Sequence, residues 1–385
     1  MTTQSPLGTG EKPYDLAIVG GGILGLAHAY LAARSGLRVV VIERDGAACG
    51  ASIRNFGFIT VTGQKRGEFY GLALRSRAIW QDVVEQFRLQ VVHSGLLMCV
   101  RHPESEAVLD AFMKTEMAQG CQLLSPMDVA LPLAQDVSRV LHSRHEIRLE
   151  SRDVIPALAA ALAEQLKVDF RYFCTALDVK AGEIATSKGT IRATNIVVCQ
   201  GDNLSGPLWD RLPNYAVSRC KLQMLRLEAP GYSLPGAVMS DLGLVRYLGY
   251  SELPPAEALR TRLKREQGEH LDAGVHLIVV QGADGTLVVG DSHVYGDTLD
   301  PFANDRFDAL ILDEFTRVLG PPPAVRDRWI GTYATSDKQL YFIDRPDERI
   351  RSVVVTCGAG ASTAFSIAEK SLHSLGLDIH DTHTY

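Results

Sequence analysis

The hydrophobic pattern of the first fifty residues predicts a strand, a helix and a second strand. Residues 15–19 form a short apolar run that ends in glycines, and residues 37–43 form another. The stretch between them has helical character and ends at Gly36, because glycine readily adopts the left-handed conformation that terminates helices. The three elements together predict a βαβ unit.

The same kind of pattern predicts the remaining elements. Helices are expected over residues 69–87, 104–119 and 153–165. Strands are expected over residues 93–100, 168–174, 176–180, 191–198, 221–227, 276–281 and 286–290. Residues 219–323 combine such strands with polar turns and one or two helices, and residues 352–375 return to strand, glycine loop and helix.

Strand-to-helix features recur at the beginning, the middle and the end of the chain. A chain of 385 residues exceeds the usual size of one compact core. We predict an α/β fold, α+β overall, in which a Rossmann-like nucleotide-binding domain is assembled from separated segments, residues 14–90, 151–218 and 324–385. Residues 91–150 and 219–323 are expected to form a substrate-binding domain with a mainly antiparallel sheet, and residues 1–13 a flexible leader.

The composition is that of an ordinary globular protein. Apolar residues make up 46% of the chain, charged residues 22%, and the formal net charge is −6. We find no basic patch that would attract nucleic acid, and the arginine-rich residues 260–265 are interpreted as a solvated helix face. No apolar run reaches the length that a bilayer requires, and the polar start has no signal-peptide pattern.

The cysteine pattern favours buried, reduced thiols. There are seven cysteines, an odd number, none in CxxC spacing and several within apolar runs. Disulfides and a cysteine metal site are therefore not expected, which indicates a reducing compartment and a cytoplasmic protein with no predicted metal site. The sequence leaves the oligomeric state open.

The first glycine motif predicts a pyrophosphate site. Gly20, Gly22 and Gly25 fit G-x-G-x-x-G between a strand and a helix. The first permits the tight turn, the second lets the backbone approach a phosphate, and the third allows close packing of helix on strand. Ile23 and Leu24 open that helix, whose free N–H groups and positive dipole end favour an anion. The alternative is a purely structural glycine turn.

Glu43 ends the second predicted strand, where an acid can accept hydrogen bonds from a ribose diol. An acid there disfavours a 2′-phosphate, although the neighbouring Arg44 leaves NADP open. The following run GASIRNFGFI holds a polar cluster that suits a second phosphate or the polar rim of a flavin, and whose alternative is a surface loop. Its members are Ser52, Arg54, Asn55 and Gly57.

Two later turns can also contact a nucleotide. Cys199 ends the apolar run IVVC, and Gly201 lies in the turn that follows, which is either structural or a nucleotide contact. The tail loop GAGAST opens a helix whose N-terminus, with about half a positive charge, can face an anionic ring edge. This loop contains Gly358, Gly360, Ala361, Ser362 and Thr363.

Taken together, these stretches resemble the FAD-dependent D-amino-acid oxidase superfamily, which includes glycine oxidase and sarcosine oxidase. The resemblance rests on GGGILG with Glu43, on VVCQGD and on TCGAGAST, and it covers nearly the whole chain. The runs GASIRNFG, GDSHVYG and GAGASTAF look closest to a subgroup linked with aminophosphonate breakdown.

The resemblance implies a resident FAD that lies extended along the nucleotide-binding domain. The glycine triplet would hold its pyrophosphate, Glu43 its adenosine ribose, the Ser52–Gly57 cluster the flavin side, and the tail loop the pyrimidine edge. Leu177 would offer its backbone to the adenine. Some relatives attach FAD through a cysteine, but none lies between Cys220 and Cys357, so non-covalent FAD is expected.

The substrate side departs from the family pattern. Tyr333 stands where many relatives carry an arginine that clamps a carboxylate, and Val288 or Val289 where sarcosine oxidases carry a lysine that activates oxygen. An anionic head group could instead be bound by other polar residues, each of which has a purely structural alternative. The candidates are Arg246, Tyr247, His293, Tyr295, Tyr333 and Lys338.

The resemblance implies an enzyme that oxidises a C–N bond of a small amine or amino acid, an aminophosphonate among them. Hydride would pass to flavin N5, the imine would hydrolyse, and O2 or another acceptor would take the electrons. One alternative is a dehydrogenase that uses a quinone or a protein acceptor instead of O2. Another is an FAD-holding protein without turnover. A plain NAD dehydrogenase would leave the middle and tail motifs unexplained.

Overall fold

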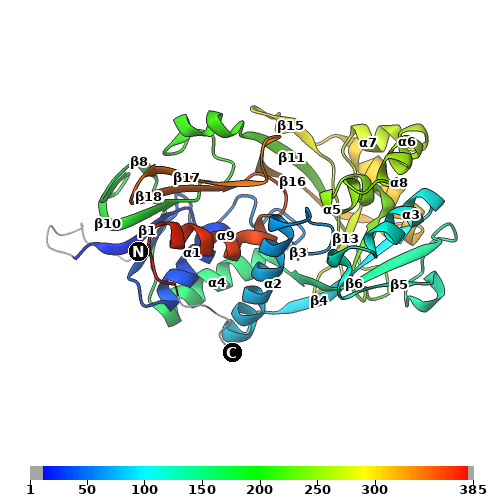
Figure 1. Ribbon diagram of the computed structural model, residues 1–385, viewed down its shortest axis with the longest axis horizontal. Helices are drawn as coiled ribbons and strands as arrows, with labels where there is room; N and C mark the ends of the chain where they lie inside the picture. The colour runs from blue at the N-terminus through cyan, green and yellow to red at the C-terminus, as the bar shows by residue number, and fades with distance from the viewer. Residues whose placement is uncertain (1–11, 380–385) are drawn as a thin grey trace.

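Two β-sheets with helices packed against them make up a computed structural model of the chain, which describes residues 12–379 (Figure 1). Residues 1–11 of the predicted leader lie outside the described residues. None of the described helices combines the length and the apolar character needed to span a bilayer.

The first sheet has a parallel core. Its central order is β17-β18-β10-β1-β2-β7, and β8 and β9 extend it through antiparallel pairs. Its strands are β1 (Tyr14–Val19), β2 (Val39–Ile42), β7 (Asp169–Arg171), β8 (Ala176–Lys180), β9 (Glu183–Thr186), β10 (Gly189–Val198), β17 (Tyr341–Asp347) and β18 (Ile350–Val355). The central strands are nearly continuous runs of Val and Ile because both faces of a parallel sheet are buried.

Four helices pack around one another beside this sheet. They are α1 (Ile23–Arg34), α2 (Glu68–Phe87), α4 (Ser151–Leu166) and α9 (Gly360–Ser374). Phe365 of α9 is fully buried and lies edge-to-face against Trp80 of α2, at 5.0 Å between ring centroids, and against Tyr30 of α1, at 5.8 Å. These aromatic contacts fix the C-terminal helix against the N-terminal unit.

The second sheet is antiparallel except for the β12–β4 pair. Its order is β15-β11-β14-β13-β12-β4-β6-β3, with β16 on β11 and β5 on β6. Its strands are β3 (Phe58–Ile59), β4 (Val91–Val100), β5 (Cys121–Leu124), β6 (Arg139–Leu149), β11 (Ser218–Leu227), β12 (Ala237–Ser240), β13 (Ile278–Gln281), β14 (Leu287–Gly290), β15 (Val294–Gly296) and β16 (Val325–Thr335).

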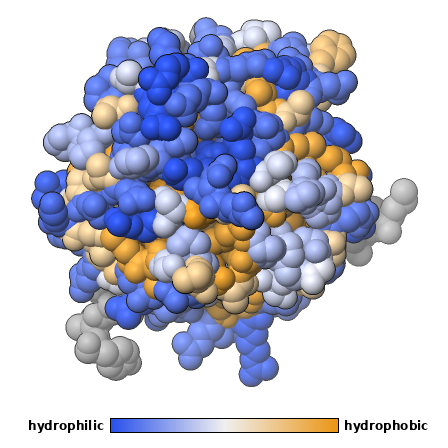
Figure 2. Space-filling view, turned by 90° about the vertical axis from the view of Figure 1, so that its right-hand side faces the viewer, coloured by the Kyte–Doolittle hydropathy of each residue, from blue (hydrophilic) through white to orange (hydrophobic). Residues whose placement is uncertain are grey.

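A group of helices covers the far end of this second sheet. They are α3 (Pro103–Phe112), α5 (Leu248–Ser251), α6 (Ala256–Glu266), α7 (Gly268–Asp272) and α8 (Asp305–Leu319). Ile311 and Phe315 of α8 are fully buried in the core of this half. Figure 2 shows the outer face of this end, where hydrophilic side chains predominate and hydrophobic ones appear between them in the lower part.

The predicted fold class is confirmed, with a parallel sheet and a mainly antiparallel one. The expected helix over residues 104–119 was too long. It ends at Phe112, because the Thr115 hydroxyl donates to the Phe112 carbonyl and only a short 3-10 turn follows. The domain boundaries stay a prediction, although β3 and β16 lie in segments assigned to the nucleotide-binding domain and pair with the second sheet.

Candidate functional site

A cavity of about 460 Å³ is lined by residues from both sheets. The turn between β1 and α1 contributes Gly22, the loop after β18 contributes Gly358, and β11, β13 and β16 contribute Leu222, Ile278 and Tyr333. This volume lies within the usual range of small-molecule and cofactor sites. The site is therefore assembled from segments that are far apart in the sequence.

The glycine triplet forms a close contact between β1, α1 and the end of β10. A Cβ on Gly20, whose φ is +105°, would overlap the Cys199 carbonyl, and a Cβ on Gly25 would overlap the Gly20 carbonyl. A Cβ on Gly22 would lie 2.9 Å from the Ser52 hydroxyl oxygen, at the cavity wall. Gly20 and Gly25 are thus required for packing, and Gly22 keeps the backbone accessible from the cavity.

The N-terminus of α1 opens onto the cavity. Ile23 and Leu24 line it together with Gly22 and Gly25, and no side chain of the capping residue bonds the first turn. The Ile23 N–H donates to the Ser52 hydroxyl at 2.9 Å. This is the arrangement in which a helix N-terminus binds an anion.

The Glu43 side chain stabilises the glycine turn through a hydrogen bond to its backbone. Its carboxylate accepts from the N–H of Gly21 at 2.8 Å and from the N–H of Asp45 at 3.0 Å. Arg44 is exposed and pairs with Asp45 at 3.3 Å. Neither Glu43 nor Arg44 lines the cavity itself. A carboxylate accepts several hydrogen bonds at once, so Glu43 keeps acceptor capacity for a hydroxyl.

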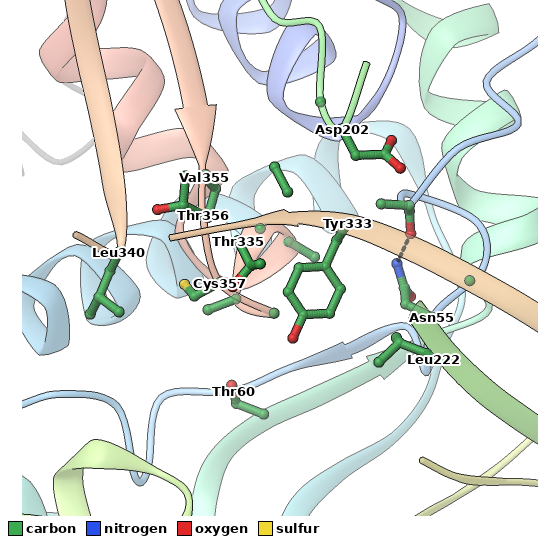
Figure 3. Close-up of a pocket in the computed structure, with 18 of the residues that line it drawn as sticks. Asn55, Thr60, Asp202, Leu222, Tyr333, Thr335, Leu340, Val355, Thr356 and Cys357 are labelled. Carbon is green, nitrogen blue, oxygen red and sulfur yellow. Dashed lines mark hydrogen bonds between the residues drawn. The ribbon is translucent and has the colours of Figure 1, made fainter. Parts of the chain in front are cut away.

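The polar cluster after β2 is partly structural. Ser52, Arg54 and Asn55 line the cavity. The Asn55 side chain donates to the Ala51 carbonyl at 2.7 Å (Figure 3) and accepts from the Gly57 N–H at 2.6 Å. Gly57 has a φ of +59°, and a Cβ on it would overlap the Leu149 carbonyl. Asn55 and Gly57 therefore fix this loop, while the exposed Arg54 side chain remains available to a ligand.

The N-terminus of α9 also opens onto the cavity. Gly358, Gly360 and Ala361 line it, and no side-chain cap bonds the first turn of the helix. The other two residues of the tail motif point into the packing. The Ser362 hydroxyl accepts from the Thr60 N–H at 2.9 Å, and the Thr363 hydroxyl donates to the Ala359 carbonyl at 3.0 Å.

The residues present fit an extended dinucleotide. Two helix N-termini and a glycine turn face one cavity, which suits a ligand with negative charge at separate points. Between the cavity-lining residues Cys199 and Gly201, both amide atoms of Gln200 are buried without a hydrogen-bond partner. Gln200 itself does not line the cavity, so the fit rests on the glycine turn and the two helix N-termini. Leu177 lies apart on β8, 63% exposed.

Five of the predicted substrate-side residues come together in the cavity wall. Arg246, Tyr247, His293, Tyr295 and Tyr333 all line it. The Arg246 guanidinium donates to the Tyr295 hydroxyl at 3.1 Å. Figure 3 shows the Tyr333 ring projecting from β16 into the cavity, on the side of Thr60.

The electrostatics of this wall favour an anion. Burial lowers the pKa of Arg246, but Tyr295, Tyr333 and Asp291 outweigh that effect, so the net shift is upward and the side chain stays charged. Burial raises the pKa of Tyr247 and of Tyr333 above the usual tyrosine value, so both hydroxyls stay neutral. These five residues thus offer one permanent cation, Arg246, beside the neutral hydroxyl groups of Tyr247 and Tyr333.

Lys338 does not belong to this group. It is exposed in the turn between β16 and β17 and does not line the cavity. Val288 and Val289 are buried in β14 and do not line it either. A lysine that the sequence reasoning missed, Lys65, does line the cavity, and its ammonium lies 3.5 Å from a Glu252 carboxylate oxygen.

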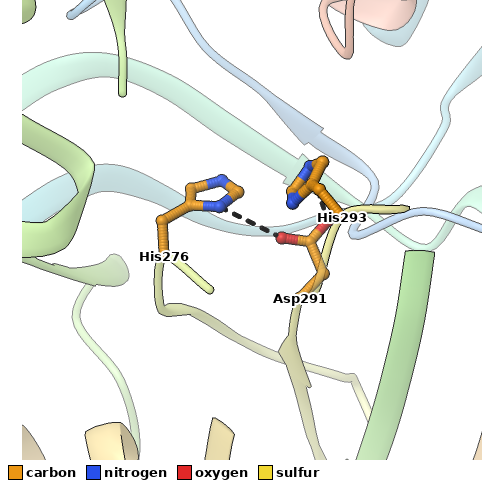
Figure 4. A group of neighbouring side chains, drawn as sticks. All are labelled: His276, Asp291 and His293. Atoms are coloured by element: carbon orange, nitrogen blue, oxygen red, sulfur yellow. Dashed lines mark ion pairs between the residues drawn. The ribbon is translucent and has the colours of Figure 1, made fainter. Parts of the chain in front are cut away.

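The sequence reasoning also missed His276 and Asp291, which lie beside His293 (Figure 4). Burial raises the pKa of Asp291 to about 7 and lowers that of both histidines well below the usual value, so the imidazoles are neutral. The register of β13 and β14, which pairs Ile278 with Gly290, brings residue 276 close to residues 291–293. If β13 and β14 had been predicted to form a hairpin around the turn at residues 283–285, His276 would have been expected beside Asp291 and His293.

The comparisons with known proteins agree with this geometry. A family model described as DAO, FAD dependent oxidoreductase, matches residues 15–370. No curated protein matches the sequence significantly.

Many solved structures share the fold. Glycine oxidase from Geobacillus kaustophilus superposes with a TM-score of 0.75 at 18% identity, over 94% of this chain and 95% of that one. L-proline dehydrogenase from P. horikoshii gives 0.75 at 17%, over 95% and 94%. L-α-glycerophosphate oxidase from Mycoplasma pneumoniae, a structure with FAD bound, gives 0.74 at 14%, over 96% and 96%.

Proposed function

Because the chain belongs to the DAO family of FAD-dependent oxidoreductases, we propose that it oxidises a C–N bond of a small amine that carries an anionic group. Oxidation of amino-acid or amine C–N bonds with FAD is typical of this family. The anionic group is the part of the proposal that belongs to this chain. It is carried by one observation, the charged Arg246 in the wall of the cavity that the nucleotide motifs also line.

Three separated segments hold FAD in this proposal. The turn at Gly20, Gly22 and Gly25 with the N-terminus of α1 binds the pyrophosphate, and Glu43 binds the adenosine ribose. Ser52 and Arg54 lie along the flavin side, and the N-terminus of α9 faces the pyrimidine edge. Leu177 is proposed to contact the adenine through its backbone. The chemistry that FAD supplies when bound is acceptance of two electrons as a hydride.

Arg246 orients the substrate in this proposal. Among the described residues its one hydrogen-bond partner is Tyr295, so most of the five guanidinium N–H groups remain for a ligand. A guanidinium binds a carboxylate or a phosphonate through two parallel hydrogen bonds, which fixes direction as well as position. Arg246 thereby binds the anionic group of the substrate, which Tyr333 cannot do because it has no positive charge.

The remaining wall residues keep the reacting carbon in place and exclude water. The neutral hydroxyls of Tyr247 and Tyr333 can donate to the substrate without competing for its proton. A substrate amine that enters neutral needs no strong acid–base pair for loss of hydride, so orientation and desolvation are the contributions that the protein must make.

An aminophosphonate is the finer form of the proposal. The runs GASIRNFG, GDSHVYG and GAGASTAF resemble the subgroup linked with aminophosphonate breakdown. The structural neighbours glycine oxidase and L-proline dehydrogenase are named for amino acids, which carry a carboxylate. Because Arg246 suits either anion, the substrate must be decided by experiment.

The test is anaerobic mixing of the FAD-bound protein with a panel of primary and secondary amines. The panel contains matched compounds with a phosphonate, a carboxylate or no acid group. We expect the visible absorbance of the flavin to bleach with anionic amines and far more slowly with the neutral ones. Retention of the oxidised spectrum with every compound would refute the proposal.

A second candidate function is a dehydrogenase that passes electrons to a quinone or a protein. Val288 and Val289 are buried at the position where sarcosine oxidases carry a lysine that activates oxygen. Among the described residues, the one lysine that lines the cavity is Lys65, which pairs with Glu252. Fast dye reduction together with slow reoxidation by O2 would favour it. Equally fast reoxidation by O2 would favour an oxidase.

A further inference from the structure

His276, Asp291 and His293 form a compact polar group in the cavity wall (Figure 4). His276 precedes β13, whereas Asp291 and His293 follow β14. One ligand atom from each residue lies within 4.8 Å of the other two. Their exposed fractions are only 4%, 4% and 7%. Buried polar groups normally pair with one another, so their hydrogen-bond pattern is informative.

The pattern around His293 leaves an acceptor facing an acceptor. Its Nδ1 lies 2.8 Å from the Gly274 carbonyl oxygen, which can only accept, so Nδ1 carries the hydrogen. In the neutral ring Nε2 is then an acceptor, and it lies 3.7 Å from the Asp291 Oδ2 atom. This pair needs either a hydrogen or a cation between its members.

The pattern around His276 is similar. Its Nδ1 lies 3.4 Å from the Asp291 Oδ1 atom and 3.5 Å from the Gly274 carbonyl oxygen, and its Nε2 lies 3.5 Å from the Tyr247 hydroxyl. The Asp291 Oδ1 atom is buried without a hydrogen bond. A proton on Asp291 can bridge to one histidine, whereas a bound cation satisfies all three side chains together.

We propose that His276, Asp291 and His293 bind a divalent transition-metal ion. Tetrahedral coordination at ordinary Zn–N and Zn–O bond lengths separates the ligand atoms by roughly 3.3 Å. The His276 nitrogen lies 3.4 Å from Asp291 Oδ1 and the His293 nitrogen 3.7 Å from Asp291 Oδ2, so each histidine faces a different carboxylate oxygen at about this spacing, and all the ligand atoms lie within 4.8 Å of one another. The Gly274 carbonyl and the Tyr247 hydroxyl hold the outer nitrogens, as outer partners of metal-binding histidines do.

Two imidazoles and one carboxylate select for ions such as Zn²⁺, Co²⁺ or Fe²⁺ over Mg²⁺ and Ca²⁺. The positive charge of Arg246 in the same wall weakens binding of every divalent cation, so the selection among them comes from the imidazole ligands alone. All three ligands line the cavity, so the open coordination positions face it. The proposal concerns metal binding alone and does not depend on which amine is oxidised.

The test is metal uptake by the FAD-bound protein. The protein is treated with a chelator, equilibrated with Zn²⁺ or Co²⁺ and analysed for metal content, and a crystal of the Zn²⁺-loaded protein is examined for anomalous scattering. We expect one ion per chain, a visible Co²⁺ spectrum of a site with nitrogen ligands, and an anomalous peak among the three side chains. No uptake, or a peak elsewhere, would overturn the proposal.

Variants localise the site. His293→Ala is expected to abolish uptake, and Tyr247→Phe to weaken it by about 10- to 100-fold, the usual effect of losing an outer partner. His270 is similarly buried and pairs with Asp313 at 2.9 Å outside the cavity, so His270→Ala is the matched control and should bind the ion fully. Full uptake by a folded, FAD-bound His293→Ala protein would contradict the assignment. If that variant does not fold, the position of the anomalous peak in the Zn²⁺-loaded wild type tests the assignment instead.

Discussion

Arg246 is the residue on which orientation of the substrate depends in our proposal, because its guanidinium lines the cavity and has one hydrogen-bond partner among the described residues. Its type and its neighbours in LVRYLGY made it a candidate for an anionic head group, and it lines the cavity. Lys338 was selected by the same reasoning and lies exposed outside the cavity. The difference depends on where β16 turns into β17, which single residues do not encode.

The first prediction concerns the charge of Arg246. Arg246→Met should lower kcat/KM for anionic amines by about 10²-fold or more, because the loss of one partner of a desolvated charge pair costs about 2–5 kcal/mol. Arg246→Lys should retain part of the activity, since it keeps the charge but not the paired hydrogen bonds. Steady-state kinetics on anionic and neutral amines provide the measurement.

The control removes a positive charge elsewhere. Lys264 is exposed on α6 and does not line the cavity, so Lys264→Met should leave kcat/KM unchanged. If Arg246→Met slowed anionic and neutral amines equally, Arg246 would act through the fold and not through the substrate anion.

At the scale of elements, the turn from β1 to α1 was predictable because its chemistry is local. The glycine spacing directly encodes the close approach of Gly20 and Gly25 to neighbouring backbone. The length of α3 was not predictable from the sequence. The hydrophobic pattern continues beyond Phe112, but the helix ends there and the Thr115 hydroxyl donates to the Phe112 carbonyl. Helix ends depend on individual hydrogen bonds that periodicity does not report.

A second prediction separates the glycines by role. Gly22→Ala should fold but bind FAD at least tenfold more weakly, because the added Cβ meets only the Ser52 hydroxyl oxygen at 2.9 Å and narrows the cavity wall. Gly25→Ala should destabilise the protein itself, since its Cβ would overlap the Gly20 carbonyl. FAD titration and thermal unfolding measure the two effects.

Gly71 supplies the matched control. It lies exposed within α2, and an added Cβ there meets no atom within 4 Å. Gly71→Ala should therefore stabilise the helix by about 0.4–1 kcal/mol and leave FAD affinity unchanged. Equal loss of FAD binding in Gly71→Ala and Gly22→Ala would contradict the role assigned to Gly22.

A third prediction concerns a buried ion cluster that joins β4 to α8. Arg101 contacts Asp241 at 2.6 Å and Glu314 at 2.7 Å, so one guanidinium serves two buried carboxylates. Burial raises the pKa of Glu314 to about 7, despite Arg101. A raised acid pKa favours the protonated form in the folded state, so this contribution to stability is complete below pH 4.5 and is lost as the pH rises to about 7.

Glu314→Gln should remove this dependence. As the pH rises through this window, the free energy of unfolding of the wild type should fall relative to that of the variant by an amount on the order of 2–3 kcal/mol. The thermal midpoint of the wild type should therefore fall relative to that of the variant. Parallel midpoints for the two proteins across the window would show that folding does not raise the pKa of Glu314.

At the scale of the whole molecule, the hydrophobic patterns of the strands predict the two sheets. They do not predict which distant strands pair with one another. The central strands of the first sheet are apolar runs, and both sheet types were predicted. The pairing of β3 with β6 and of β16 with β11 joins residues far apart in the chain and brings Tyr333 into the cavity. Such long-range register depends on packing that no local window contains.

A fourth prediction follows from the discontinuous assembly of the site. Because FAD binding involves the turn at β1, the loop after β2 and the N-terminus of α9, the FAD-free protein should be less stable. At a free FAD concentration of a hundred times Kd, the gain is about 2.7 kcal/mol in the free energy of unfolding. A thermal midpoint that does not change with FAD concentration would contradict binding across these segments.

The most direct measurement is a crystal structure of the FAD-bound protein with an anionic amine analogue that cannot be oxidised. We expect the FAD pyrophosphate at Gly20, Gly22 and Gly25, and the anionic group of the analogue on the guanidinium of Arg246. An analogue whose anionic group binds away from Arg246, or a cavity that contains no flavin, would contradict this expectation.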